Sequence, residues 1–291
     1  MSANMPLPGR IIDRLEEYNK RSRIKSKEEA EQVDVLLPNW SDSVRRVPNV
    51  ALRSALFAAV SKGCRPYFER VKINALGGIS ILYTGALLDQ GDLDVWETVL
   101  HLSRTKEMGS ECRVTAYRLL KELGKTDTGK NRAILDKHLS RMSATSLQIR
   151  VGELSYEGGL IHEVYRDHET RNYVIRLNPG LRVLFFADQF TDIDWDVRKA
   201  LNGRPLAQWL HGFYATHARP YDLKIETLHS LCGSRAGRLS DFKKDLRRAL
   251  DSLQKARDEV GQEFSYSIEK GLVRVKTTPT YSQRKHLSNK R

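Results

Sequence analysis

The pattern of two helices joined by a glycine turn occurs at residues 224–257, KIETLHSLCGSRAGRLSDFKKDLRRALDSLQKAR. The first helix is expected at Glu226–Leu231, and Gly233 in the following turn tolerates a positive φ. The second helix is expected to begin near Gly237 or Arg238. Its apolar residues, spaced by three or four, form one stripe: Leu239, Phe242, Leu246, Leu250 and Leu253. The stretch therefore predicts a helix-turn-helix.

The face opposite this stripe is basic. At about 100° per residue it holds Gly237, Asp241, Lys244 and Arg248, with Arg247 beside them. Residues 234–257 contain eight Lys or Arg and three Asp, a local charge of +5. A helix-turn-helix whose second helix is basic on its outer face fits the DNA major groove. The alternative is a basic surface helix that only faces solvent.

Composition favours an anionic partner. The chain has 291 residues, a net charge of +13 and a pI near 9.7, which indicates nucleic acid more often than an anionic membrane surface. No apolar run approaches the ~20 residues that a transmembrane helix needs, and the N-terminus has no apolar signal core. Cys64, Cys112 and Cys232 are too few and too far apart for a disulfide framework or a zinc ribbon. A cytoplasmic protein is expected.

The chain length favours two domains. Residues 1–35 are expected to form a polar, basic arm, in which Lys20–Lys27 is a basic run, and residues 277–291 a disordered basic tail. Between them we predict one domain over 36–180 and a second, the main DNA reader, over 181–276. The expected fold class is α+β, with tandem winged-helix domains between a flexible arm and a basic tail.

The element order carries this prediction. In the first domain, Asn49 is expected to cap a helix containing Leu52, Leu56 and Phe57, and Val71–Tyr83 is expected to form a hairpin around two glycines. A helix at Leu93–Ser103 then precedes a short strand, a helix, a turn, a helix and further strands. Their expected ranges are 113–115, 116–123, 124–128, 130–143, 147–151, 160–166 and 172–178.

The same order returns in the second domain. Helices are expected at Trp195–Leu201, where Asp192 or Asp194 would cap the first turn, and from Pro205. A short strand at Leu223–Ile225 precedes the helix-turn-helix, and a hairpin at residues 263–276 follows it. Strand, helix, turn, helix and hairpin is the order of a winged helix, so the pattern predicts an internal structural repeat.

Both predicted recognition helices and hairpins carry candidate DNA-binding residues. Those of the second domain are Arg235, Arg238, Lys243, Lys244, Arg247, Arg248, Lys270 and Arg274. Those of the first domain are Lys130, Asn131, Arg132, Lys137, Arg141, Arg166 and Arg171. Arginine at base edges or phosphates, and lysine at phosphates, supplies the usual contacts to duplex DNA.

Residues 124–131, GKTDTGKN, nearly match a phosphate-binding P-loop. The last position is Asn131, which offers no hydroxyl to Mg²⁺, and the preceding segment is predicted as a helix where a P-loop needs a strand. We interpret the motif as the turn of the first helix-turn-helix, with Lys130, Asn131 and Arg132 near a DNA phosphate. No nucleotide cofactor is expected.

The sequence has no grouping typical of catalysis. The eight histidines are scattered without the spacing and acidic neighbours of a metal site, which disfavours a rolling-circle nicking enzyme. No Ser-His-Asp or Cys-His grouping is evident. A non-enzymatic protein with no metal and no cofactor is expected.

Several segments resemble the TrfA family of plasmid replication initiators, in the same order from about Leu36 to Lys276. They are Leu37-Pro38-Asn39, Val47-Pro48-Asn49, Arg53–Phe57, Tyr83-Thr84-Gly85, Trp96 with Val99-Leu100, Arg219-Pro220-Tyr221, Lys224 with Glu226-Thr227, and Leu231–Ser234. The resemblance implies two winged helices that bind direct repeats, called iterons, in double-stranded origin DNA. It further implies opening of adjacent AT-rich DNA, recruitment of the host initiator DnaA, the replicative helicase and the sliding clamp, and a monomer–dimer equilibrium.

The expected function is therefore that of a plasmid replication initiator. A transcriptional regulator built from the same winged helices is the main alternative, and an enzyme with a nicking or NTPase site is a third. Direct repeats beside an AT-rich stretch near the gene would favour initiation, whereas a single palindrome would favour a repressor.

Overall fold

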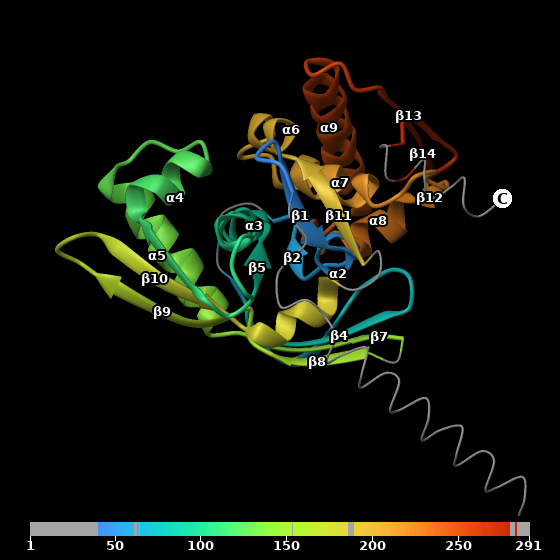
Figure 1. The fold of residues 1–291 in the computed structure, drawn as a ribbon. Helices are drawn as coiled ribbons and strands as arrows, with labels where there is room; N and C mark the ends of the chain where they lie inside the picture. The colour runs from blue at the N-terminus through green and yellow to red at the C-terminus, as the bar shows by residue number, and fades with distance from the viewer. Residues whose placement is uncertain are drawn as a thin grey trace, which may run out of the picture. The chain divides into compact units, whose positions relative to one another are not determined.

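Two helix pairs, each flanked by a three-stranded sheet, organise the chain (Figure 1). The structure is a computed structural model, and it describes residues 40–60, 63, 65–152, 154–185, 189–279 and 283. The mixed helix and strand content confirms the predicted α+β class, whereas the tandem winged-helix arrangement stays a prediction. The predictions for residues 1–35 and for most of 277–291 lie outside the described residues. Among the described residues, no helix combines the length and apolar character that crossing a membrane requires.

The first helix pair is α4 (Ala116–Glu122) and α5 (Gly129–Ser143). Thr115 and Thr128 cap the two helices, because their hydroxyls accept from the backbone N–H groups of Arg118 and Asn131. The chain turns between them at Gly124, whose φ is +65°. The flanking antiparallel sheet has the order β6 (Glu111–Thr115), β10 (Asn172–Leu177), β9 (Ile161–Asp167).

The second helix pair has the same connectivity. Helices α8 (Ile225–Leu231) and α9 (Leu239–Asp258) lie between strand β12 (Leu223–Lys224) and the hairpin β13 (Phe264–Glu269)–β14 (Leu272–Thr277). The sheet order is β12-β14-β13, so here too the strand before the helix pair joins the last strand of the hairpin. We call each helix pair with its three-stranded sheet a unit: α4, α5 and their sheet form the first unit, and α8, α9 and their sheet form the second. The predicted helices, turns and hairpins of both units match the structure to within a few residues.

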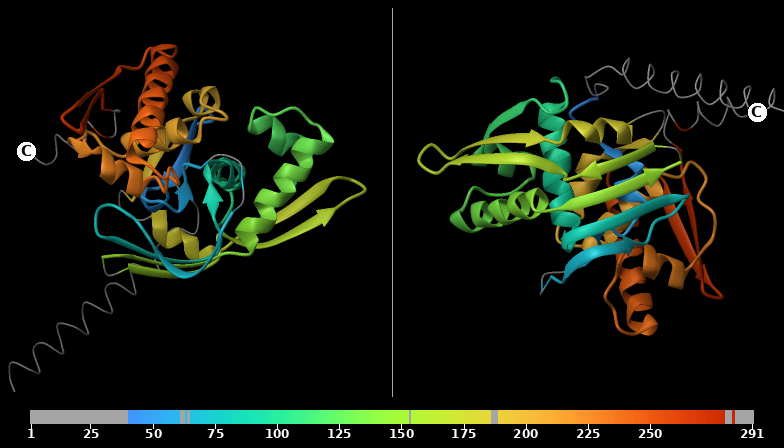
Figure 2. Two further views of the ribbon diagram at one scale, coloured as in Figure 1. Left: turned by 180° about the vertical axis from the view of Figure 1, so that it is seen from behind. Right: turned by 90° about the horizontal axis from the view of Figure 1, so that it is seen from below.

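A separate four-stranded antiparallel sheet has the order β3 (Tyr67–Ile73), β4 (Ile79–Ala86), β7 (Ser146–Val151), β8 (Leu154–Gly158), as the view from below shows (Figure 2). The predicted hairpin around Gly77-Gly78 is confirmed, and both glycines have positive φ. Strand β8 was not predicted. Strand periodicity identifies a strand but not its partner, so the pairing of β7 with β4 is fixed only by tertiary contacts.

The helix predicted from Asn49 through Phe57 is wrong in length and in its cap. Helix α2 contains only residues Asn49–Leu52, Pro48 occupies the N-cap position, and the Asn49 side chain instead accepts from the Thr191 hydroxyl at 2.7 Å. Phe57 lies in β2 (Phe57–Ala58), which pairs in parallel with β5 (Leu88–Asp89). Tertiary pairing overrides the helical spacing of the apolar residues here.

Strand pairing joins distant parts of the chain. Strand β1 (Val44–Pro48) pairs antiparallel with β11 (Phe190–Asp194). Strand β1 lies near helix α3 (Gln90–Ser103), and β11 lies near helix α7 (Pro205–Ala215). Between β10 and β11 lies the 3₁₀ helix η1 (Pro179–Phe185), and Asp194 caps α6 (Trp195–Ala200), as predicted. The described residues all belong to one compact unit, Leu37–Arg291. The predicted domain division at residue 180 stays a prediction.

Buried hydrophobic residues form two clusters, one drawn from residues 40–195 and one from residues 197–275. Polar contacts cross between them. The buried Arg198 guanidinium donates to the Asp94 carboxylate at 2.7 Å and to the Gln90 carbonyl at 3.3 Å. The Arg53 guanidinium donates to Thr216 at 2.9 Å and 2.7 Å. A bidentate or charged contact of this kind fixes the relative orientation of the elements that carry it.

Glu97 on α3 is buried beside this polar network, and neither of its carboxyl oxygens has a hydrogen-bond partner among the described residues. Burial, assisted by the nearby Asp94 and opposed by Arg198 and Arg45, raises the pKa of Glu97 to about 8. The folded protein therefore holds a proton at neutral pH that the unfolded chain has released.

Replacement of Glu97 with glutamine should flatten the pH dependence of stability. Because the folded pKa lies above the unfolded one, the wild-type chain loses stability as pH rises between the two values, by up to about 1.4 kcal/mol per pH unit. Glu97→Gln keeps the shape of the side chain and removes its titration. The measurement is urea unfolding of both proteins at about pH 5.5 and about pH 7.5. Equal changes of unfolding free energy in both proteins would contradict this role of Glu97.

Candidate DNA-binding surfaces

The turn between α8 and α9 depends on Gly233. Its φ is +63°, and a Cβ there would lie 3.0 Å from the Ala58 Cβ and 3.1 Å from the Ala55 Cβ. The Ala59 N–H donates to the Cys232 carbonyl at 2.7 Å, which holds the turn against residues 55–59. A side chain at residue 233 would therefore be strained in conformation and crowded in space.

Helix α9 has the two faces that the sequence predicts, with one correction. Phe242, Leu246, Leu250 and Leu253 are buried, but Leu239 is 40% exposed and does not belong to the stripe. Leu239 is the first residue of the helix, so no preceding turn covers it. Helical spacing alone does not reveal that end effect.

The outer face of α9 presents exposed cations. Lys243, Lys244 and Arg247 are exposed and form no ion pair with a described residue. Arg248 lies 3.3 Å from Asp245, and both side chains are largely exposed. An exposed pair of this kind stabilises by about 0–1 kcal/mol, so Arg248 can exchange its partner for a phosphate or a base edge at little cost.

The remaining candidates of this unit lie just before α9 or in the hairpin that follows it. Arg235 and Arg238 are exposed just before α9, and Lys270 is exposed at the tip of the β13–β14 hairpin. Arg274 on β14 is exposed as well, but its Nε and Nη2 donate to the Asp222 Oδ2 at 3.1 Å and 2.8 Å. The sequence pattern does not show that Asp222, 52 residues away, holds Arg274.

In the first unit, the near-P-loop follows helix α4 and forms the turn before α5. The Asn131 side-chain amide donates to the Thr126 carbonyl at 2.8 Å, and the Arg132 guanidinium pairs with both oxygens of Asp127. The helix-to-turn context agrees with our interpretation of this segment as the turn of a helix-turn-helix. Lys130 is exposed at the start of α5.

Several arginines predicted to face outward from the first unit are held by carboxylates. Arg166 on β9 donates to Asp136 at 3.2 Å and to the Ser140 hydroxyl at 3.0 Å. Arg141, predicted to lie on the outer face of α5, points to α3 and is only 14% exposed, which corrects that prediction. Lys130, Lys137 and Arg171 are exposed. The sequence reasoning missed Arg118 and Lys121, three residues apart and both exposed on α4.

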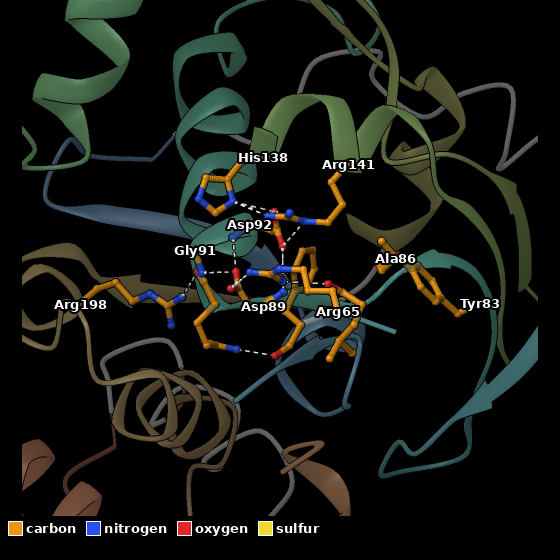
Figure 3. Close-up of polar contacts among 12 residues, drawn as sticks. Arg65, Tyr83, Ala86, Asp89, Gly91, Asp92, His138, Arg141 and Arg198 are labelled. Atoms are coloured by element: carbon orange, nitrogen blue, oxygen red, sulfur yellow. Dashed lines mark hydrogen bonds and ion pairs between the residues drawn. The ribbon is translucent and has the colours of Figure 1, made fainter. Parts of the chain in front are cut away.

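Arg141 binds Asp92, which is fully buried at the start of α3 (Figure 3). The Arg141 Nε and Nη2 lie 3.0 Å and 2.7 Å from Asp92 Oδ1, and the His138 Nδ1 lies 2.7 Å from the same oxygen. The Asp89 backbone N–H donates to Asp92 Oδ2 at 2.8 Å. Burial raises the pKa of Asp92, but hydrogen bonds from His138 and Arg141 outweigh it and lower the pKa below its ordinary value. We call Asp92, His138 and Arg141 the ion-pair hub, and these contacts fix α5 to α3.

The same cluster contains atoms of the type that ligate metals. Donor atoms of Asp89, Asp92 and His138 all lie within 4.8 Å of one another. However, the Arg65 guanidinium pairs with Asp89 and lies 3.5 Å from Asp92, and Arg141 pairs with Asp92 from the other side. A divalent cation placed here would be repelled by both guanidiniums. The residues therefore fit an ion-pair hub and do not fit a metal site.

Comparison with known proteins gives a family match. A family model described as "TrfA protein" matches residues 18–275. The plasmid replication initiator protein TrfA of Escherichia coli is 29% identical over 224 residues, which are 74% of this chain and 58% of that protein. The chain thus spans less than two thirds of the length of this relative.

Solved structures show a similar fold. The crystal structure of RctB domains 2 and 3 matches with a TM-score of 0.51 at 14% identity, covering 79% of this chain and 97% of that chain. A selenomethionine derivative of the same two RctB domains matches with a TM-score of 0.50 at 14% identity, covering 77% and 95%. At this level of identity the likeness concerns the arrangement of elements.

Proposed function

This chain belongs to the TrfA family, and we propose that it is a plasmid replication initiator that binds directly repeated sites at a plasmid origin. The observation that carries the proposal is the outer face of α9, where exposed cations lie opposite a buried apolar stripe. A basic recognition helix after a tight turn is the arrangement that enters a DNA major groove.

The two helix pairs with their sheets act as tandem winged helices in this proposal. Each has a short strand, two helices and a hairpin, and in each the hairpin's last strand pairs with the short strand. Helix α9 would read bases through Lys244, Arg247 and Arg248, with Arg235, Arg238 and Lys270 at flanking phosphates. Helix α5 would supply Lys130 and Lys137, mainly to phosphates.

The ion pairs of the first unit support this unequal division of roles. Arg132, Arg141 and Arg166 are paired with Asp127, Asp92 and Asp136, which leaves Lys130 and Lys137 as the exposed cations of α5. Lysine is a flexible point charge that suits phosphate contact, whereas bidentate base readout is typical of arginine. The first unit would therefore add affinity and register, and the second unit most of the sequence specificity.

Partners follow from the family. Origin opening with recruitment of the host initiator DnaA, the replicative helicase and the sliding clamp, together with a monomer–dimer equilibrium, is part of the proposal. The chain itself would act without catalysis. A winged-helix transcriptional regulator is the alternative, because it would use the same basic helix on a palindrome.

A footprinting experiment with a matched variant tests the proposal. The full chain should protect about two helical turns of one direct repeat, because two recognition helices on one duplex face lie about 34–36 Å apart. Lys130→Ala with Lys137→Ala should shorten protection to about one turn and reduce the slope of log affinity against log salt by about 2. Lys106→Ala with Arg113→Ala is the matched control for a loss of charge, because these exposed cations, just before and on β6, are not among the proposed DNA contacts.

Two outcomes would count against the proposal. Protection of a palindrome in preference to direct repeats would support the regulator instead. An unchanged footprint and salt slope in the α5 variant would show that the first unit does not touch DNA. That unit would then be better described as a surface for a host protein or a second copy.

A further inference from the structure

A cleft of about 980 Å³ lies on a part of the molecule that the proposed DNA contacts do not use. One wall is the β1–β11 pair, and the other is formed by α7, the C-terminal part of α9 and the open end of the β13–β14 hairpin. Strands β1 and β11 belong to the first hydrophobic cluster and α7 and α9 to the second, so the cleft is bounded by both. Small-molecule sites in proteins usually have volumes of about 300–1,000 Å³.

Two arginines line this cleft without an acidic partner. Arg257 is 7% exposed, and its Nη1 donates to the Thr277 hydroxyl at 2.8 Å, but its buried Nε has no partner and no described carboxylate forms an ion pair with it. Arg53 is half-buried, and among the described residues its guanidinium donates only to the hydroxyl and the carbonyl of Thr216. Burial lowers the pKa of both guanidiniums. Buried positive charge of this kind favours an anion nearby.

The acids of the cleft are engaged elsewhere. Asp192 accepts two hydrogen bonds from Arg46, at 2.6 Å and 2.7 Å. Asp194 caps α6 and accepts from the Gln262 amide at 2.7 Å, and it acts on Arg257 only through longer-range attraction. Glu263 accepts from the Thr278 hydroxyl at 2.7 Å. No described carboxylate therefore forms an ion pair with Arg53 or Arg257, and only the charge of Asp194 attracts Arg257 from a longer distance.

Two neutral polar side chains of α7 also line the cleft. The His211 Nδ1 and the Tyr214 hydroxyl are buried, and neither has a hydrogen-bond partner among the described residues. Burial, together with the charges of Arg257 and Arg198, lowers the pKa of His211, so the ring is neutral at pH 7. Burial raises the pKa of Tyr214, so its hydroxyl stays protonated and can donate. Unsatisfied buried groups are costly unless a ligand satisfies them.

We propose that this cleft binds a small oxyanion with phosphate or carboxylate groups, with Arg53 and Arg257 as its charge partners and Tyr214 as a hydrogen-bond donor. Guanidinium groups match the planar oxygens of phosphates and carboxylates, and such charge-assisted hydrogen bonds are stronger than neutral ones. A bound anion would touch elements of both hydrophobic clusters. The inference does not depend on DNA binding, since Arg53, Arg257 and Tyr214 are not among the proposed DNA contacts.

Isothermal titration of the full chain with pyrophosphate and, separately, with citrate at matched ionic strength tests the proposal. We expect saturable binding at one site for at least one of the two probes, and the probe that binds identifies the anionic group as phosphate or carboxylate. Arg257→Gln should weaken this binding by at least about tenfold, as expected for loss of a charge-assisted contact. The matched control is Lys244→Ala with Arg248→Ala, which lowers the charge of α9 on its outer face and should leave anion binding unchanged.

Tyr214→Phe provides a second variant that keeps the packing if Arg257→Gln does not fold. It removes the unpartnered hydroxyl and should weaken anion binding about threefold or more. Absence of saturable binding with both probes would overturn the proposal. Equal affinity in the wild type, Arg257→Gln and Tyr214→Phe would overturn it as well. Loss of binding in the Lys244→Ala, Arg248→Ala control would place the anion on the DNA-binding face and so reject the cleft.

Discussion

Replacing Lys244 and Arg248 with alanine is expected to weaken binding to the specific repeat by roughly 2–4 kcal/mol, with a smaller loss on random duplex. Both side chains are exposed on the outer face of α9, opposite the buried Phe242, Leu246 and Leu250. A good arginine contact to guanine contributes about 1–3 kcal/mol of discrimination, whereas a lysine contact to phosphate adds affinity without sequence preference. The loss should therefore appear as a reduced ratio of specific to random affinity.

The measurement is a titration of the wild type and the double variant on repeat and random duplexes at one fixed salt concentration. Lys255→Ala is the control, because Lys255 is an exposed cation of the same helix about three turns further on. Urea unfolding of the double variant should match the wild type to within about 0.5 kcal/mol, since exposed substitutions rarely change stability. A folded double variant with unchanged specific affinity would remove α9 from the proposed interface.

Asp92→Asn should cost about 3–5 kcal/mol of unfolding free energy, because it leaves the buried side of Arg141 without its carboxylate. Asp92 has no exposed surface, and Arg141, His138 and Arg65 all lie around it. The substitution keeps the size of the side chain but removes its charge. Since the hub joins α3 to α5, the variant should also bind DNA with a lower salt slope, as α5 loses its fixed position.

The pH dependence gives this prediction a second measurement. The folded pKa of Asp92 lies below its ordinary value, so its contribution to stability is present above the unfolded pKa and is lost as pH falls through the folded pKa. Asp92→Asn should therefore lose less stability than the wild type on acidification below about pH 4. Asp245→Asn, which removes an exposed pair with Arg248, should change stability by less than about 1 kcal/mol. A comparable small effect in Asp92→Asn would contradict the hub.

The local structure of both helix pairs was predictable from the residues in them. Gly124 and Gly233 mark the two turns, and the spacing of Phe242, Leu246 and Leu250 gives the buried face of α9. The hairpins around Gly77-Gly78 and Gly271 were also predictable. These features depend on turn chemistry and on periodicity within a few residues, so the local sequence contains the information.

The pairing of the strands, and which cations are left exposed for DNA, depend on contacts between distant parts of the chain. The β1–β11 pair joins residues about 146 positions apart, as in the ion pair between Arg46 and Asp192, and no local sequence pattern predicts it. The helical spacing of the apolar residues predicts that Arg141 lies on the outer face of α5, but the buried Asp92 of α3 binds it. Arg274 is likewise held by a distant carboxylate. Charge composition determines that the chain is basic; the position of each carboxylate in the fold determines which basic side chains can reach DNA, because an ion pair depends on distance in space and not on separation in sequence.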